Sequence, residues 1–137
     1  PIVKAFEAGK REVEEWENVT TEIHGVRVPN PLGGSLVLDV LYESNGFGTM
    51  VDDNAVNEVR ARVCAEEGLH MCPEGAACLV ALEMERQTGR VGPDDRVVVF
   101  NSASGLKFPM PPMTQGLDKD QAVDYSALSA SARSIAS

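Results

Sequence analysis

The chain has 137 residues, 43% of them hydrophobic and 24% charged, and a formal net charge of −9. This length suits one domain with its own core. Lysine and arginine are scattered among acidic residues, which argues against a nucleic-acid partner, because phosphate binding depends on clustered basic residues. No apolar run approaches the roughly 20 residues of a membrane span, so we expect no membrane partner.

The cysteines and the first residue bear on the compartment and on completeness. Cys64, Cys72 and Cys78 contain no Cys-x-x-Cys pair, and the two histidines have no recognised metal spacing. Small buried thiols in a reduced, cytoplasmic compartment are therefore favoured over disulfides or a zinc site. The chain starts with Pro1 and has no recognisable secretion signal, so we expect a piece of a longer protein.

The first third of the chain predicts two helices separated by a loop. Residues 2–16 place apolar residues among Glu and Lys in a loosely helical pattern. Residues 20–31 contain two prolines, which exclude a helix interior. Ser35 is the expected N-cap of a helix that ends near Ser44. The Gly33-Gly34 pair before it lacks the spacing of a phosphate-binding loop, so a helix-entry turn is preferred over phosphate binding.

An apolar stripe at helical spacing predicts a third helix, which Asp52 and Asp53 begin and Gly68 ends. The stripe consists of Ala55, Val56, Val59 and Val63, with Glu58, Arg60 and Arg62 off it.

Pro73 suits the first turn of a fourth helix, which runs to about Thr88. Glu74 lies at the positive end of this helix. The small residues 75–77 leave its N-terminus without bulk, which suits close packing against a sheet or contact with a polar ligand.

The apolar run Val97–Phe100 predicts a strand buried on both faces. Residues 47–51 are a further short strand candidate, so the chain is expected to be α/β, with part of a mostly parallel open sheet and flanking helices. Asn101–Gly105 follows the carboxyl end of the central strand, where open sheets place ligands. An ordinary strand-to-helix loop remains the alternative.

The last part of the chain differs in composition. Residues 108–113 are proline-rich, and the chain from Asp118 onward is rich in serine and alanine, which predicts disorder or a weak surface helix. We therefore expect residues 1–109 to form the domain portion and residues 110–137 to form a tail.

Four segments, in this order, resemble the carboxyl-terminal part of threonine synthases, which are pyridoxal-phosphate enzymes of the tryptophan-synthase β-subunit fold. They are Pro1-Ile-Val-Lys-Ala-Phe-Glu, Gly25-Val-Arg-Val-Pro, Pro73-Glu-Gly-Ala-Ala and Val97-Val-Val-Phe-Asn-Ser-Ala-Ser-Gly-Leu-Lys107. The resemblance covers about residues 1–109 and implies the carboxyl-terminal portion of the large cofactor-binding domain. The implied reaction converts O-phosphohomoserine and water to threonine and phosphate.

The resemblance also implies roles for individual residues. Ser102 matches the Ser or Thr whose hydroxyl meets the ring nitrogen of pyridoxal phosphate, while Asn101, Cys72 and Gly25 are further candidates for contact with this cofactor. The role of Arg27 stays open between a structural one and contact with a substrate anion.

The reactive lysine of the family is not matched in this chain. In the family, that lysine forms the Schiff base within a Ser-Phe-Lys-Asp-type motif. This motif and the loop that holds the cofactor phosphate both lie upstream of the matched segments. None of Lys4, Lys10, Lys107 and Lys119 has this context. We therefore expect no catalytic residue and no metal site in this chain, and no activity from the chain in isolation. The remainder of the enzyme, in the same polypeptide or in a partner chain, is the expected partner, with a homodimer as one arrangement.

Two alternatives remain. Related dehydratases carry Glu-Pro-Ser-Gly where this chain has Cys72-Pro-Glu-Gly75. This difference favours a threonine-synthase-like protein over a related ammonia-lyase acting on serine, threonine or diaminopropionate. The alternative from another class is a non-catalytic α/β interaction module.

Overall fold

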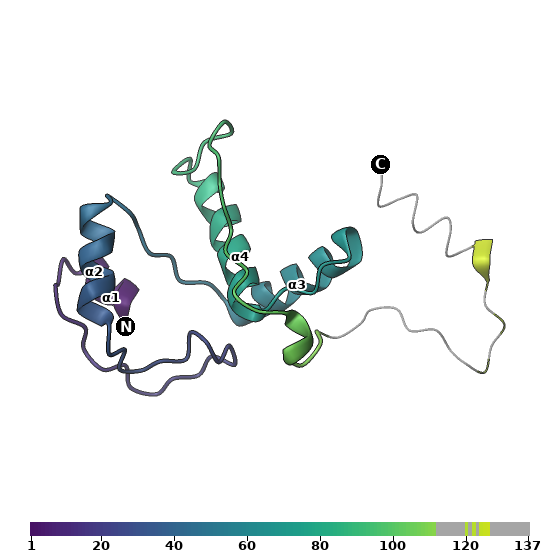
Figure 1. The fold of residues 1–137 in the computed structure, drawn as a ribbon, viewed down its shortest axis with the longest axis horizontal. Helices are drawn as coiled ribbons and strands as arrows, with labels where there is room; N and C mark the ends of the chain where they lie inside the picture. The colour runs from purple at the N-terminus through teal and green to yellow at the C-terminus, as the bar shows by residue number, and fades with distance from the viewer. Residues whose placement is uncertain (112–119, 121, 123, 127–137) are drawn as a thin grey trace.

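The computed structural model describes residues 1–111, 120, 122 and 124–126. In this part of the chain the helices are α1 (Ile2–Glu7), α2 (Gly34–Glu43), α3 (Asp53–Glu67), α4 (Pro73–Gln87) and the short 3-10 helix η1 (Gly105–Lys107). The four α-helices form two pairs, with α1 beside α2 and α3 packed against α4, joined by an extended connection (Figure 1). Most of the predicted tail lies outside the described residues.

The main hydrophobic core lies between α3 and α4 and includes one residue of the loop that precedes α2. Its buried members are Ile23, Val56, Val59, Met71, Ala76 and Val80. Val99, from the segment after α4, is half-buried and packs against this cluster. The core therefore joins four separate parts of the sequence on the side of the molecule that carries α4.

The first helix is shorter than predicted. α1 ends at Glu7, and Gly9 adopts a left-handed φ of +67°. A helix to Trp16 was wrong because a residue in this conformation ends a helix, and glycine adopts it without steric cost. α1 packs on α2 through Phe6 and Tyr42, whose ring centroids lie 5.0 Å apart.

The predicted end of α2 near Ser44 is correct within one residue, but the helix begins two residues earlier than predicted, and its cap is not Ser35. Gly33 is the N-cap residue, and no side chain caps this helix. Gly34 is buried, and a Cβ there would lie 2.6 Å from Val13 Cγ2. The two glycines form the entry turn of α2 and allow close packing.

The predictions for α3 and α4 are confirmed at the helix ends. Asp52 accepts hydrogen bonds from the backbone nitrogens of Asn54, at 2.9 Å, and Ala55. Gly68 ends α3 with a φ of +66°, and Pro73 is the first residue of α4. These signals are local, which explains why the sequence reveals them.

Arg60 differs from its predicted place on the polar face of α3, since it is only 6% exposed. Its guanidinium donates to the backbone oxygen of Met71 at 3.4 Å and to that of Pro109 at 3.0 Å. The side chain therefore joins α3 to the segment that follows η1, and its charge is buried among carbonyl acceptors.

The predicted sheet is not confirmed within the described residues. The β pairing there is a single isolated antiparallel bridge between Met71 and Ser104. The prediction that the Val97–Phe100 run is buried on both faces is wrong for this chain, because Val98 is 93% and Phe100 80% exposed. A strand is buried on both faces when neighbouring strands and a second layer cover it, and here the core contacts it through Val99 alone.

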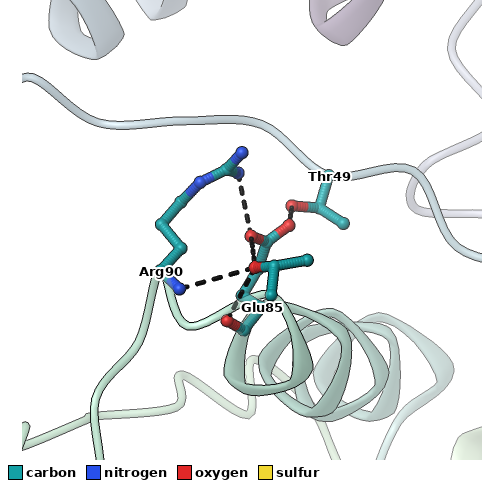
Figure 2. Close-up of polar contacts among 4 residues, drawn as sticks. Thr49, Glu85 and Arg90 are labelled. Carbon is teal, nitrogen blue, oxygen red and sulfur yellow. Dashed lines mark hydrogen bonds and ion pairs between the residues drawn. The ribbon is translucent and has the colours of Figure 1, made fainter.

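A buried carboxylate holds the extended segment before α3 against the end of α4 (Figure 2). Glu85 is 7% exposed and accepts a hydrogen bond from Thr49 Oγ1 at 2.7 Å. Its other oxygen pairs with Arg90 at 2.8 Å and is 3.4 Å from Thr88 Oγ1. The Arg90 guanidinium also lies 4.6 Å from the ring centre of Phe47. The middle of this connection, at Phe47 and Thr49, is thereby held at the carboxyl end of α4.

The three cysteines are free thiols in different environments. Cys72 is buried, Cys64 is half-buried and Cys78 is exposed, so the expectation of buried thiols is wrong for Cys78. Among the residues described, no three or more histidine, cysteine or acidic side chains group as a metal site would require. No described helix combines the length and the apolar character that crossing a membrane demands.

Candidate functional site

The N-terminus of α4 is built around Cys72. This residue has extended backbone angles and is the N-cap, and its sulfur accepts a hydrogen bond from the backbone nitrogen of Gly75 at 3.3 Å. The Cys72 carbonyl accepts from Ala76 at 3.0 Å. A thiol therefore occupies the place that Ser, Thr, Asp or Asn usually takes at a helix start.

Asn101 and Ser102 meet this helix end from the segment that follows Val97–Phe100. Asn101 Oδ1 accepts from the backbone nitrogen and from the sulfur of Cys72, both at 3.2 Å. Ser102 Oγ lies 3.7 Å from the same sulfur. Three of the four cofactor-binding candidates predicted from the sequence thus lie together, although 29 and 30 residues separate Cys72 from the other two.

Gly75 makes this approach feasible. A Cβ on Gly75 would lie 2.5 Å from Asn101 Oδ1 and 3.3 Å from Asn101 Cα, closer than side chains normally allow. The space that the small residues 75–77 leave at the start of α4 is therefore partly filled by Asn101. Close packing and a polar contact, which the sequence offered as alternatives, occur at the same point.

The loop beyond Ser102 is fixed to the residues that precede α4. The Met71–Ser104 bridge is accompanied by a hydrogen bond from the Gly105 nitrogen to the His70 oxygen at 2.8 Å. Ser104 Oγ accepts from the nitrogen of Leu106 at 3.3 Å and so caps η1. Ser102 is exposed between these anchors and the Asn101 contact.

Gly25, the fourth candidate, reaches the same turn of α4 by another route. Its backbone nitrogen donates to Glu74 Oε1 at 2.8 Å. Gly25 and Asn101 therefore contact neighbouring residues of α4, Glu74 and Gly75. Arg27, two positions further along, is exposed, and its guanidinium forms no ion pair within the described part of the chain.

Two positioning carboxylates were not predicted from the sequence. Glu74 and Asp53 were recognised only as favourable charges at helix starts, yet each also holds the loop before α2. Their partners lie 31 to 49 residues away in the chain. No local sequence signal reports a bond over that distance.

The described lysines lie outside the group formed by Cys72, Asn101 and Ser102. Lys4 stacks over Trp16 with 5.5 Å to the ring centre, Lys10 pairs with Glu14, and Lys107 is exposed in η1. Lys119 falls outside the described residues.

A comparison with protein families shows which family the chain belongs to. The model of the family described as pyridoxal-phosphate dependent enzyme matches residues 1–103. The chain belongs to this family. The predicted resemblance is thereby confirmed at family level, and the family implies the α/β fold of the tryptophan-synthase β subunit. Enzymes of this family depend on pyridoxal phosphate.

Relatives with curated names are threonine synthases. Those of Methanocaldococcus jannaschii and Methanosarcina acetivorans are 28% and 29% identical over 109 residues, which cover 80% of this chain and 27% of each relative. Threonine synthase 2, chloroplastic, of Arabidopsis thaliana is 27% identical over 79% of this chain and 21% of its own length. The chain thus spans about a quarter of the length of these relatives.

The donors in the site suit the cofactor of the family. At 3.7 Å the Ser102 hydroxyl has only a weak contact with the Cys72 sulfur, so its proton is available to an acceptor such as a pyridine nitrogen. Asn101 is held by Cys72, so the backbone of the next residue, Ser102, which carries the exposed hydroxyl, is fixed in place.

Proposed function

We propose that this chain is the carboxyl-terminal part of a threonine synthase, which converts O-phosphohomoserine and water to threonine and phosphate. The observation that carries the proposal is the convergence of Ser102 and Asn101 on Cys72 at the start of α4. The family match over residues 1–103 supports a pyridoxal-phosphate dependent enzyme, and the names of the three relatives support this reaction within the family.

Within the proposed enzyme this chain supplies one wall of the cofactor site. Ser102 donates its hydroxyl proton toward the ring nitrogen, and Asn101 and Cys72 hold the backbone that carries Ser102. The Gly25 loop contacts the same first turn of α4 through Glu74. Pyridoxal phosphate, when bound, supplies the electron sink for carbanion chemistry. A neutral hydroxyl leaves the ring nitrogen mostly unprotonated, which makes a milder sink than a carboxylate partner would.

The rest of the site is proposed to come from outside this chain, from the same polypeptide or from a partner. The lysine that holds the cofactor and the loop for its phosphate have no counterpart among residues 1–137. Val98 and Phe100, exposed next to the site, are proposed to pack against that remainder. In this proposal residues 1–109 form the domain portion, and the isolated chain is inactive.

Substitution of Ser102 in the complete protein tests this role. Ser102→Ala removes the donor while Asn101 and Cys72 keep the loop in place, so we expect lower turnover of O-phosphohomoserine with the cofactor still bound. A fall of about a hundred- to a thousandfold is in the range for the loss of one positioned hydrogen-bond donor. Ser35→Ala, an exposed position on α2, is the matched control and should change nothing. Unchanged turnover in Ser102→Ala would contradict this role and show that the serine serves only in the turn.

A further inference from the structure

Two carboxylates at the starts of two helices hold the same loop from both ends. Asp53, the first residue of α3, accepts from Thr21 Oγ1 and from the backbone nitrogen of Glu22, each at 2.7 Å. Glu74, the second residue of α4, accepts from the backbone nitrogen of Gly25 at 2.8 Å. Ile23, between the two anchors, is 5% exposed in the core. Residues 21–25 are thereby fixed relative to both helices.

The carboxylate of Glu74 suits this task. Its position in the first turn of α4 places its negative charge at the positive end of the helix. A backbone N–H that donates to an ionised carboxylate forms a stronger bond than one between neutral groups. Glu74 is half-buried and Gly25 is exposed, so the bond stays open to water and its strength comes from the charge and the placement of the carboxylate.

Gly25 and the Glu74 side chain are packed so closely that a side chain at residue 25 would displace the Glu74 carboxylate. A Cβ on Gly25 would lie 2.5 Å from Glu74 Oε1 and 2.6 Å from its Cγ. On the next residue of α4, Gly75, a Cβ would meet Asn101 Oδ1 at the same distance of 2.5 Å. The first turn of α4 therefore receives the Gly25 loop and the Asn101-Ser102 loop at adjacent residues.

We propose that Glu74 is a positioning residue of the cofactor site, which fixes the Gly25 loop at a set place relative to Ser102. It acts through the Gly25 N–H and not by contact with the cofactor or the substrate. The inference rests on the proposed function for the presence of the cofactor, whereas the Glu74–Gly25 bond stands on its own. Substitutions of Glu74 by residues that lack a correctly placed acceptor release the loop and weaken cofactor binding.

The proposal is tested by hydrogen exchange and cofactor titration on the complete protein, both without substrate. In Glu74→Ala we expect the Gly25 amide to exchange about ten- to a hundredfold faster, the range for losing a bond to a charged acceptor. We also expect the dissociation constant of pyridoxal phosphate to rise about tenfold or more, since small misplacements of a binding group are costly.

Two further variants separate positioning from general damage. Glu74→Gln keeps a side-chain oxygen at the same reach but loses the charge, so it should recover part of the protection of Gly25 and part of the cofactor affinity. Glu83→Ala removes an exposed carboxylate from the same helix and should change neither measurement. Unchanged exchange in residues 56–63 of α3 verifies that a variant is folded.

Two outcomes would overturn the proposal. Unchanged Gly25 exchange in a folded Glu74→Ala protein would show that the bond does not hold the loop. Faster exchange with unchanged cofactor affinity would show that the bond is purely structural. A protein that binds the cofactor with this dependence on Glu74, yet forms no threonine from O-phosphohomoserine, would support the role of Glu74 and contradict the proposed function alone.

Discussion

Gly75 lies directly against Asn101: a Cβ at this glycine would come within 2.5 Å of the Asn101 side-chain oxygen. That oxygen accepts from both the backbone nitrogen and the sulfur of Cys72. The position of the loop that carries Ser102 therefore depends on the absence of a side chain at residue 75.

Gly75→Ala should move this loop. The added methyl group overlaps Asn101, and such overpacking costs about 1–3 kcal/mol, more than the roughly 1 kcal/mol that alanine gains over glycine inside a helix. Urea denaturation of the complete protein measures the difference. Gly92→Ala is the control, since a Cβ at Gly92 would make only an ordinary contact, 3.5 Å from Asp95 Oδ2. Equal stability of both variants would show that Asn101 moves aside without cost.

Glu85→Ala should loosen the extended connection before α3. The substitution removes the acceptor of Thr49 and the ion partner of Arg90, both of which contact a carboxylate that is 7% exposed. We expect a loss of about 1–3 kcal/mol of unfolding free energy. Glu83→Ala on the same helix breaks an exposed pair with Arg62 and should cost about 0–1 kcal/mol. The same loss in both variants would contradict a special role for Glu85.

Val98→Asp tests whether the segment before the site meets the rest of the enzyme. Val98 is 93% exposed, so the isolated chain should keep its stability and self-associate less, as analytical ultracentrifugation would record. In the complete protein an unpaired buried charge at this point should cost about 3–5 kcal/mol. Leu32→Asp, at an equally exposed residue next to α2, is the control. A complete protein that tolerates Val98→Asp as well as this control would place the remainder elsewhere.

The sequence predicts the helices to the extent that their ends carry local signals. Asp52, Gly68 and Pro73 mark three ends correctly because each acts on backbone groups within its own turn. α1 was predicted too long because Val13 and Trp16, beyond Gly9, continue the apolar pattern of a helix that the left-handed glycine ends. Arg60 was misplaced because its carbonyl partners come from distant loops.

The sheet and the site depend on distant contacts to different degrees. The Val97–Phe100 run has the composition of a buried strand, but its burial requires neighbours that the described residues do not provide. Cys72, Asn101 and Ser102 were named together through the family resemblance, and their contacts follow from the fold. The Glu74–Gly25 bond spans 49 residues and was visible only in the structure.

The most direct measurement of the proposed function is a product assay on the complete protein loaded with pyridoxal phosphate. O-phosphohomoserine is compared with serine, threonine and diaminopropionate, and threonine, phosphate and ammonia are quantified. We predict equal amounts of threonine and phosphate from O-phosphohomoserine, and little ammonia from the other amino acids. Ammonia release from those amino acids, with no threonine from O-phosphohomoserine, would contradict the proposal and identify a related ammonia-lyase.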